Sequence, residues 1–148
     1  MKKIYLLDLN YTLVKNQKET RNLRPFTARL EKEEYRKDLV DAIRSDYVII
    51  ITARPDYQGK ESLENIMRKT SWNPQEAYFN DINADPPAFK ERALLRFVFP
   101  KFGTSGEQYF AVESNPKTRA MYKKYGIEAM PYEEFIKTRV GAKIYENC

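Results

Sequence analysis

Short apolar segments alternate with amphipathic ones, and this alternation restricts the fold more than any other feature of the sequence. Lys3–Leu9 is largely apolar and lacks polar alternation, which is typical of a strand buried on both faces of a parallel sheet. Four later segments have the composition of buried strands: Tyr47–Thr52, Ala77–Phe79, Gln108–Val112 and Ile127–Met130. Strands of this kind need helices on both faces of the sheet.

Amphipathic segments between these strands predict the helices. Glu31–Ser45 places Tyr35, Leu39 and Ile43 at helical spacing, so it predicts a helix whose apolar side faces the sheet. The polar segment Lys15–Arg29, with five basic residues and one acid, predicts a loop. The remaining predicted helices are Lys60–Thr70, a helix that begins at Pro86 and Pro87 and ends at Pro100, a helix capped by Asn115 that runs through Tyr125 to a terminator at Gly126, and Tyr132–Thr138.

The order of strands and helices predicts an α/β fold with three layers. We expect a Rossmann-like α/β/α arrangement on a five-stranded parallel sheet with right-handed crossovers. The length of 148 residues suits one domain over residues 1–148. A chain of this size buries roughly 68–70% of its unfolded surface, which is enough for a core. The segments between the strands leave no room for a large lid over the end of the sheet.

The composition excludes several kinds of chemistry. There is no histidine, and Cys148 is the single cysteine, which excludes histidine-activated nucleophiles, imidazole metal ligands and cysteine zinc sites. Any catalysis must therefore rely on carboxylates. Apolar stretches such as Val48–Ile51 are far shorter than the roughly 20 residues of a membrane span, so we expect a cytoplasmic protein without a membrane partner. The formal charge of +5 favours phosphate-rich partners.

Polar residues stand where the predicted strands end. Asp8 closes the first strand, Thr52 the second, and Glu113 follows the fourth, while Lys90 lies in the first turns of a helix. Ligands of parallel α/β sheets bind beyond the carboxyl ends of the strands. A carboxylate there can attack a phosphoryl group and form an aspartyl phosphate, provided that a divalent cation and positive groups offset the repulsion between anions. Asp8 is the candidate nucleophile, and the other three residues are of the types that hold phosphate and metal.

These segments together resemble the four motifs of the haloacid dehalogenase (HAD) superfamily of phosphohydrolases. Asp8–Leu13 resembles the first motif, whose leading Asp is the nucleophile, and Thr52, Lys90 and Val112–Asn115 fall at the second, third and fourth motifs. The resemblance implies a phosphatase without a cap that acts through an aspartyl phosphate. It also implies a Mg²⁺ ion held by the carboxylates of Asp8 and Glu113, the backbone carbonyl of Asn10 and an oxygen of Asn115.

The resemblance also suggests a class of substrate. Arg54 is similar to the arginine just after the second motif in polynucleotide end-phosphatases of the superfamily. Members without a cap tend to act on macromolecules or rely on a partner to close the site, and the basic segment Lys15–Arg29 would lie beside the opening. The implied substrate is a phosphate of a nucleotide or polynucleotide end, bound by Arg54, Asn10 and Thr52.

Two departures from the family pattern keep a second hypothesis open. Asn10 stands where the family usually has its general acid/base Asp, and the loss of such a group typically costs about 10²–10⁴-fold in rate. Ser114 follows Glu113 where the family often has a second acid. The alternative is a catalytically weak or inactive protein of this fold that binds a phosphorylated ligand or nucleic acid. Plainer alternatives also stand: Lys90 as a solvated helix lysine, and the basic segment as a solvated surface.

Overall fold

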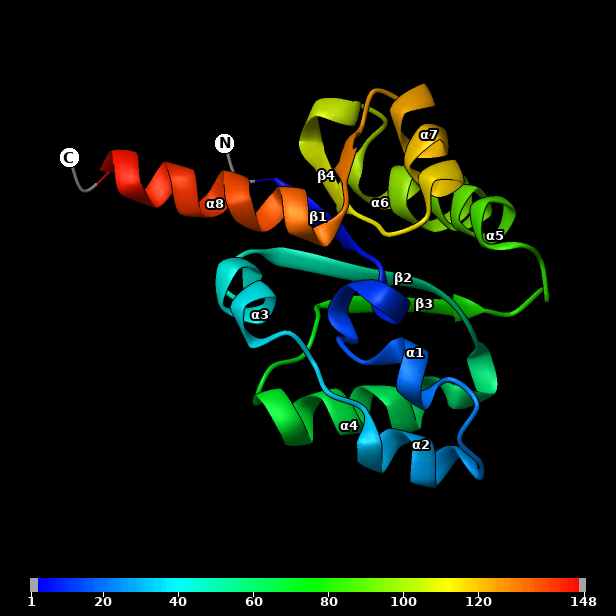
Figure 1. Ribbon diagram of the computed structural model, residues 1–148. Helices are drawn as coiled ribbons and strands as arrows, with labels where there is room; N and C mark the ends of the chain where they lie inside the picture. Colours follow the sequence, from blue (N-terminus) through cyan, green and yellow to red (C-terminus); the bar gives the residue numbers. More distant parts are fainter. Residues whose placement is uncertain (1–2, 147–148) are drawn as a thin grey trace.

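A parallel sheet forms the centre of the protein. The computed structural model describes residues 3–146, and the side chains of residues 3–139; Cys148 lies outside the described residues. Within residues 3–146, five strands pair in parallel in the order β3-β2-β1-β4-β5 (Figure 1). The strands are β1 (Ile4–Leu7), β2 (Tyr47–Pro55), β3 (Glu76–Asn80), β4 (Tyr109–Val112) and β5 (Glu128–Met130). The predicted α/β fold with a parallel sheet is confirmed.

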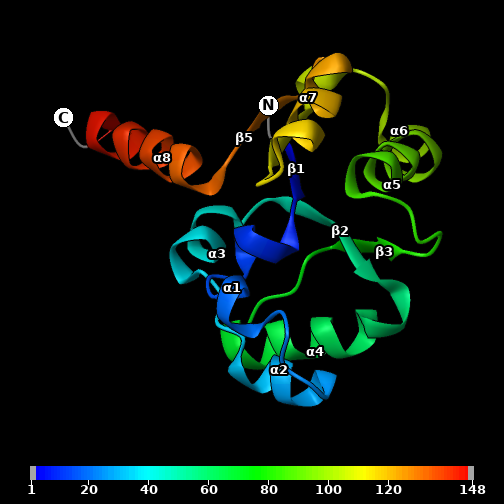
Figure 2. The same ribbon diagram turned by 45° about the vertical axis from the view of Figure 1, so that its right-hand side comes forward.

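Helices cover both faces of this sheet. One face packs against α3 (Lys37–Ile43), α4 (Gly59–Thr70) and α8 (Tyr132–Glu146), and the other against α5 (Pro86–Ala93), α6 (Phe99–Phe102) and α7 (Pro116–Lys124) (Figures 1 and 2). Consecutive strand residues enter opposite cores, because side chains alternate along a strand: Leu7 and Ile50 lie in one core, Leu6 and Ile49 in the other. Burial on both faces explains why the strands lack polar alternation, and the three predicted layers are confirmed.

The segment between β1 and β2 differs from the prediction. The predicted loop Lys15–Arg29 contains α1 (Gln17–Thr20) and the start of α2 (Phe26–Lys32). The predicted helix Glu31–Ser45 is also wrong as one element, since α2 ends at Lys32 and Tyr35 forms an isolated antiparallel bridge with Val14 before α3 begins. Tyr35 is buried, but its hydroxyl is held by Asn65 of α4 at 2.7 Å. Contacts with distant residues therefore override the helical spacing here.

The helix predicted to end at Pro100 instead passes through that proline. After α5 the chain makes a wide turn over Leu94–Val98, where the Phe99 N–H donates to the Leu94 carbonyl, and α6 follows with Pro100 in its first turn. A wide turn accommodates a residue that has no N–H and a bulky ring. Two other termini match the prediction: the Asn115 side chain accepts from the Lys117 N–H at 2.9 Å to cap α7, and Gly126 has φ +78°.

Several other strands and helices begin or end at residues different from those predicted. Strand β2 runs past Thr52 to Pro55, β3 is longer than Ala77–Phe79, and β5 begins at Glu128. Helix α8 continues from Tyr132 well beyond Thr138. Even so, no helix in the described part of the chain is both long and apolar enough to cross a membrane.

We predict that Gly106→Ala destabilises the fold. A Cβ at Gly106 would lie 2.4 Å from the Tyr125 carbonyl oxygen and 2.4 Å from the Gly126 carbonyl carbon, where the turn before β4 meets the turn after α7. Both obstacles are backbone, so we expect a loss of about 1–3 kcal/mol in the free energy of unfolding, measured with urea. The exposed neighbour Ser105→Ala is the control, and equal stability of the two variants would contradict the close approach.

Candidate active site

Asp8 and Glu113 lie at the point where the strand order reverses. Strands β2 and β3 lie to one side of β1, and β4 and β5 to the other, so the reversal falls between β1 and β4. The Asp8 N–H donates to the Val112 carbonyl at 3.0 Å, and the Glu113 N–H donates to the Met130 carbonyl at 3.0 Å. Each acid thus extends the pairing of its strand by one residue. Crevices at such reversals are the usual ligand sites of open α/β sheets.

Lys90 joins the two acids. Its Nζ lies 2.8 Å from Asp8 Oδ1 and 2.6 Å from Glu113 Oε1, and the three side chains are 2%, 6% and 2% exposed, in the order Lys90, Asp8, Glu113. The interpretation of Lys90 as a solvated helix lysine is therefore wrong. A buried charge is tolerated when it is paired and hydrogen-bonded, and here one ammonium group pairs with two carboxylates. Three segments that are far apart in the sequence supply this cluster.

The environment moves the pKa values of the two acids in opposite directions. Burial raises the pKa of Asp8, but the Lys90 charge and hydrogen bonds from Lys90, Ser114 and Thr12 outweigh it and hold this pKa below its usual value. Burial and the Asp8 charge raise the pKa of Glu113 to about 7, although Lys90 opposes them. Burial lowers the pKa of Lys90, but the two carboxylates raise it by more. At neutral pH Asp8 is therefore ionised and Glu113 is partly protonated.

Ser114 Oγ lies within hydrogen-bond distance of an oxygen of Asp8 and an oxygen of Asn10. Ser114 Oγ lies 2.8 Å from Asp8 Oδ2, to which it donates, and 3.4 Å from the Asn10 carbonyl oxygen. Carboxylate, carbonyl and hydroxyl oxygens are hard donors of the kind that Mg²⁺ accepts, so this set fits such an ion with one carboxylate. In the described residues no group of three or more Asp, Glu, His and Cys residues is placed to hold a metal.

Glu113 and Asn115, which the sequence predicted as metal ligands, have other partners. Glu113 Oε1 accepts from Lys90, and Oε2 accepts from the Asn115 N–H at 3.0 Å. The Asn115 amide oxygen accepts from the Lys117 N–H and caps α7. Glu113 therefore contacts the site mainly by holding Lys90. Asn115 holds Glu113 through its N–H and caps α7 through its side chain.

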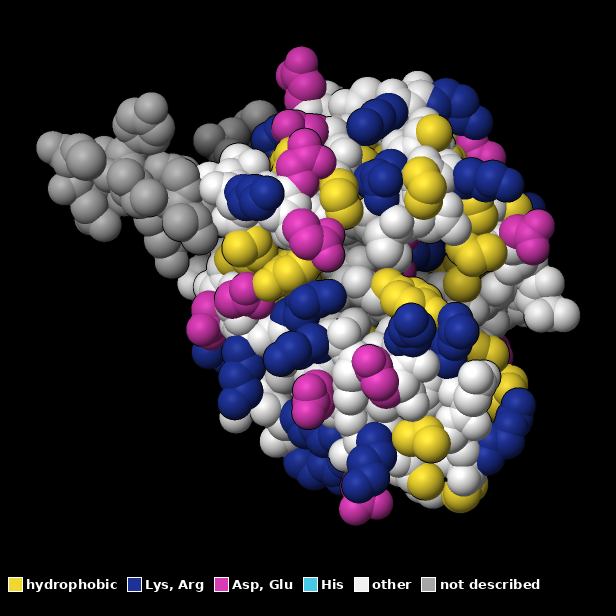
Figure 3. All heavy atoms as spheres, in the orientation of Figure 1, with side chains coloured by type: hydrophobic (Ala, Val, Ile, Leu, Met, Phe, Trp, Pro, Cys, Tyr) yellow, Lys and Arg dark blue, Asp and Glu magenta, His cyan; other side chains and the backbone are white. Residues whose placement is uncertain are grey.

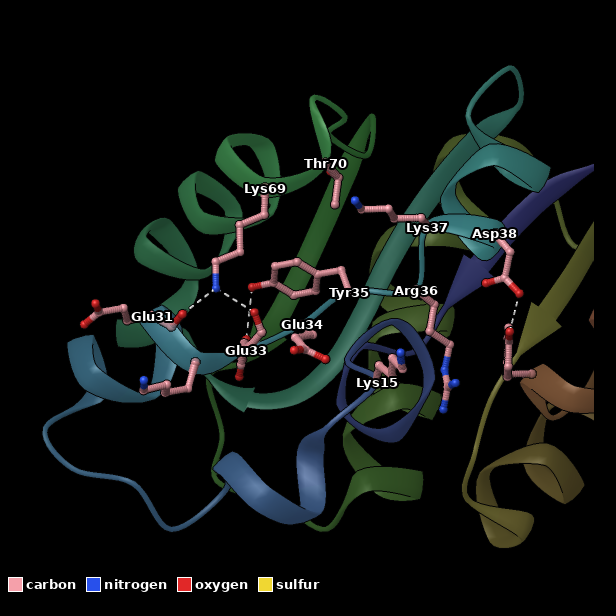
Figure 4. Close-up of a pocket in the computed structure, with 12 residues that line it drawn as sticks. Lys15, Glu31, Glu33, Glu34, Tyr35, Arg36, Lys37, Asp38, Lys69 and Thr70 are labelled. Atoms are coloured by element: carbon pink, nitrogen blue, oxygen red, sulfur yellow. Dashed lines mark hydrogen bonds between the residues drawn. The ribbon is translucent and has the colours of Figure 1, made fainter.

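Asn10 is held from its side chain by a second buried ion pair. Arg54 Nη2 lies 2.7 Å from Asn10 Oδ1 and 2.8 Å from Glu33 Oε2, and both Arg54 and Glu33 are buried. Glu33 also accepts from the Tyr35 hydroxyl at 3.0 Å, and Lys69 Nζ donates to the Glu33 carbonyl at 2.6 Å. Figure 4 shows Lys69 and Tyr35 converging on Glu33 at a cavity of about 810 Å³. The chain Glu33–Arg54–Asn10 thus fixes the residue two positions after Asp8.

Thr52 is near this arrangement but is not exposed to the cavity. A cavity of about 590 Å³ lies over Asp8, and Asn10, Tyr11, Lys90 and Ser114 are among the residues that line it. Thr52 is fully buried, is absent from the described lining, and its hydroxyl accepts from the Arg54 N–H at 3.1 Å. Because β2 continues to Pro55, Thr52 lies inside the strand. The face drawn in Figure 3 is hollowed near its middle, between the part carrying α5 and α7 and the part carrying α1 and α2.

Sequence reasoning missed three contributors to the site. Thr12 Oγ1 donates to Asp8 Oδ2 at 2.8 Å, and Ser114 does the same, although the sequence marked Ser114 only as a missing acid. The sequence signal for these two contacts was a hydroxyl residue close to each acid: Thr12 after Asp8, and Ser114 after Glu113. Glu33 offered no signal, because it lies in the charged run 31–34 and its neighbours there are solvated.

Comparisons with known proteins support the fold. No protein-family model and no curated protein matches the chain. Similar solved structures include a chain of the Pnkp1/Rnl/Hen1 RNA repair complex, with TM-score 0.67 and 14% identity, where the match covers 88% of this chain and 42% of that one. In a second structure of that complex the TM-score is 0.67 and the identity 15%, and the match covers 88% of this chain and 46% of that one. A hypothetical protein from Xanthomonas campestris has TM-score 0.54 and 14% identity over 86% of this chain and 63% of that one. This chain spans less than half of the two RNA repair chains. The likeness shows a shared Rossmann-like α/β fold.

We predict that Glu33→Ala strongly destabilises the protein. It would leave the buried Arg54 charge without its carboxylate, so we expect a loss of about 3–5 kcal/mol in the free energy of unfolding by urea. Asp41→Ala, which breaks the exposed pair with Arg44, is the control and should cost less than about 1 kcal/mol. Similar losses in the two variants would mean that Glu33 and Arg54 are not a buried pair.

We predict that Glu113 makes stability fall as pH rises. Its pKa is raised from the ordinary 4.5 to about 7, so between these values the native state binds more protons than the unfolded state, and the free energy of unfolding decreases with pH. Melting temperatures of the wild type and of Glu113→Gln, measured in chelator across this range, should show the wild type losing stability relative to the variant. Glu64→Gln, at an exposed position on α4, controls for the loss of a surface charge. Parallel curves for wild type and Glu113→Gln would contradict the raised pKa.

Proposed function

We propose that the protein is a Mg²⁺-dependent phosphatase of the HAD type that forms an aspartyl phosphate on Asp8. One observation supports this above all: the Asp8 carboxylate lies at the strand reversal, and the Nζ of the buried Lys90 donates to it at 2.8 Å. Burial raises the pKa of Asp8, but the charge and hydrogen bond of Lys90 lower it and favour the ionised form, which a nucleophilic carboxylate requires. A cavity of about 590 Å³ opens beside these groups and leaves room for a phosphate ester.

The reaction proceeds in two displacements. An Asp8 carboxylate oxygen forms a bond to phosphorus while the bond from phosphorus to the ester oxygen breaks, and the departing oxygen takes a proton from solvent water. Water then attacks the phosphorus of the aspartyl phosphate, releases inorganic phosphate and restores the carboxylate. A lysine ammonium has three N–H groups, and Lys90 uses two on Asp8 and Glu113, which leaves one for a phosphate oxygen.

Asp8, the Asn10 carbonyl and the Ser114 hydroxyl would hold Mg²⁺. When bound, the ion neutralises charge on the phosphoryl oxygens. The Asn10 side chain limits the first step, because an amide gives the leaving group no proton and its oxygen is bonded to Arg54. We therefore expect slow turnover with poor leaving groups. The fold shared with a chain of an RNA repair complex and the basic surroundings of Asn10 favour nucleotide or polynucleotide end phosphates as substrates.

The second candidate is a protein that binds such phosphates without hydrolysing them. The hydrogen bonds around Asp8 favour it, since Oδ1 accepts from Lys90 and Oδ2 accepts from both Thr12 and Ser114. A carboxylate with this many donors is a weaker nucleophile. The same cavity and lysine would then hold a phosphate group at rest.

We predict slow, Mg²⁺-dependent hydrolysis of an aryl phosphate that Asp8→Asn abolishes and Asn10→Asp accelerates. An aspartic acid at position 10 supplies the missing proton donor, so the gain should be about 10²-fold or more in kcat/KM for alkyl phosphates. Phosphate release is measured, with the exposed Asn73→Asp as the matched control. Equal release by wild type and Asp8→Asn would contradict the phosphatase and favour the binding protein. An unchanged rate in Asn10→Asp would show that another group supplies the proton.

A further inference from the structure

A second cavity adjoins the one over Asp8. It measures about 360 Å³, and Asn10 and Ala53 line both cavities. We call it the basic pocket, after the four arginines in its lining: Arg21, Arg24, Arg29 and Arg54. Arg21 and Arg24 lie between α1 and α2, Arg29 lies in α2, and Arg54 lies near the end of β2. Dark-blue Lys and Arg side chains gather over α1 and α2 on the lower part of the face in Figure 3.

The positive charge of the basic pocket exceeds its compensation. No acid belongs to the described lining, and Arg29 and Arg54 share one buried carboxylate beneath it, that of Glu33. Arg24 is exposed and makes no ion pair within residues 3–139. Arg54 is buried, and its Nε has no hydrogen-bond partner in the described part of the chain. Four arginines and no acid in the lining favour an anion as the ligand of the basic pocket.

Two contacts link the basic pocket to the site of the reaction. Asn10 turns its side chain to Arg54, while its carbonyl oxygen lies 3.4 Å from Ser114 Oγ beside Asp8. Arg21 Nη1 donates to the Tyr11 hydroxyl at 2.8 Å, and Tyr11 lines the Asp8 cavity. Because Asn10 and Ala53 line both cavities, a molecule with one phosphate at Asp8 can extend past these two residues toward the arginines.

We propose that the basic pocket binds a second phosphate of the same substrate, so that the substrate is a phosphate monoester with a neighbouring phosphate group. This inference rests on the proposed function of the Asp8 site. The second phosphate belongs to a nucleoside bisphosphate or to the next linkage of a single-stranded oligonucleotide whose end carries the reacting phosphate. Tyr57, in the lining and 78% exposed, offers a ring on which a base can stack.

Paired substrates test this inference. With Mg²⁺, kcat/KM for adenosine 3′,5′-bisphosphate should exceed that for adenosine 3′- and 5′-monophosphate by about tenfold or more, the size of one charge-assisted contact. Oligonucleotides phosphorylated at the 5′ or the 3′ end distinguish a polynucleotide source from a mononucleotide source. Arg24→Gln should bring the ratio of bisphosphate to monophosphate near one, whereas Arg96→Gln, an exposed charge on the α5 side of the molecule, should leave the ratio unchanged. Equal kcat/KM values for bisphosphate and monophosphates, or a ratio insensitive to Arg24→Gln, would overturn the inference.

A binding measurement separates failure of this inference from failure of the phosphatase. In the Asp8→Asn background, fluorescence anisotropy follows an end-phosphorylated oligonucleotide as salt increases. Adding Arg24→Gln should weaken binding and reduce the salt slope by about 0.7, the value for one lost phosphate contact on a single strand. If hydrolysis is absent but this loss is seen, the phosphatase fails and the second-phosphate site stands. If Asp8-dependent hydrolysis is seen and Arg24→Gln changes neither affinity nor slope, the site fails and the phosphatase stands.

Discussion

Lys90 carries the buried positive charge on which the two buried carboxylates of the site depend. Burial and the Asp8 charge already raise the pKa of Glu113 to about 7, and without Lys90 nothing in this pair would offset the repulsion between the two carboxylates. The lysine comes from α5, whose Phe89 and Ala93 pack in the core on one face of the sheet. The packing of α5 on the sheet therefore positions the charge that lowers the pKa of Asp8. The electrostatics of the site thus depend on the packing of the fold.

A second buried charge pair explains the unusual segment between α2 and α3. Arg54 needs a carboxylate at its guanidinium, and Glu33 reaches it because residues 33–36 are extended and not helical. The same pair holds Asn10 and forms the base of the basic pocket. Arg54 thus joins three segments beside the Lys90 cluster: strand β2, which carries it, the segment before α3 and the turn after β1.

Much of the fold could be predicted because its signals are local or depend only on burial. Buried strands lack alternation, and Asn115 followed by Pro116 supplies a cap and a first-turn proline at the start of α7. The errors at Tyr35 and Pro100 arose where distant contacts or a wide turn decided the backbone. For the site, strand ends identified the residue types that meet at Lys90. They could not show that Ser114 donates to Asp8 or that Glu113 accepts from Lys90 and from the Asn115 N–H, because that depends on where each side chain turns.

The two proposed functions, binding and hydrolysis of a phosphate, draw on the same positive charges, so the source of the proton would decide between them. Of the carboxyl groups in the Lys90 cluster, Glu113 has the pKa best suited to proton transfer near neutral pH, about 7. Its oxygens, however, accept from Lys90 and from the Asn115 N–H, which hold it inside the cluster and away from a leaving group. Glu113 thus stabilises the lysine and does not replace the acid absent at position 10. A substrate whose leaving oxygen is stable without a proton would remove this obstacle, and turnover of that substrate would then need no acid at position 10.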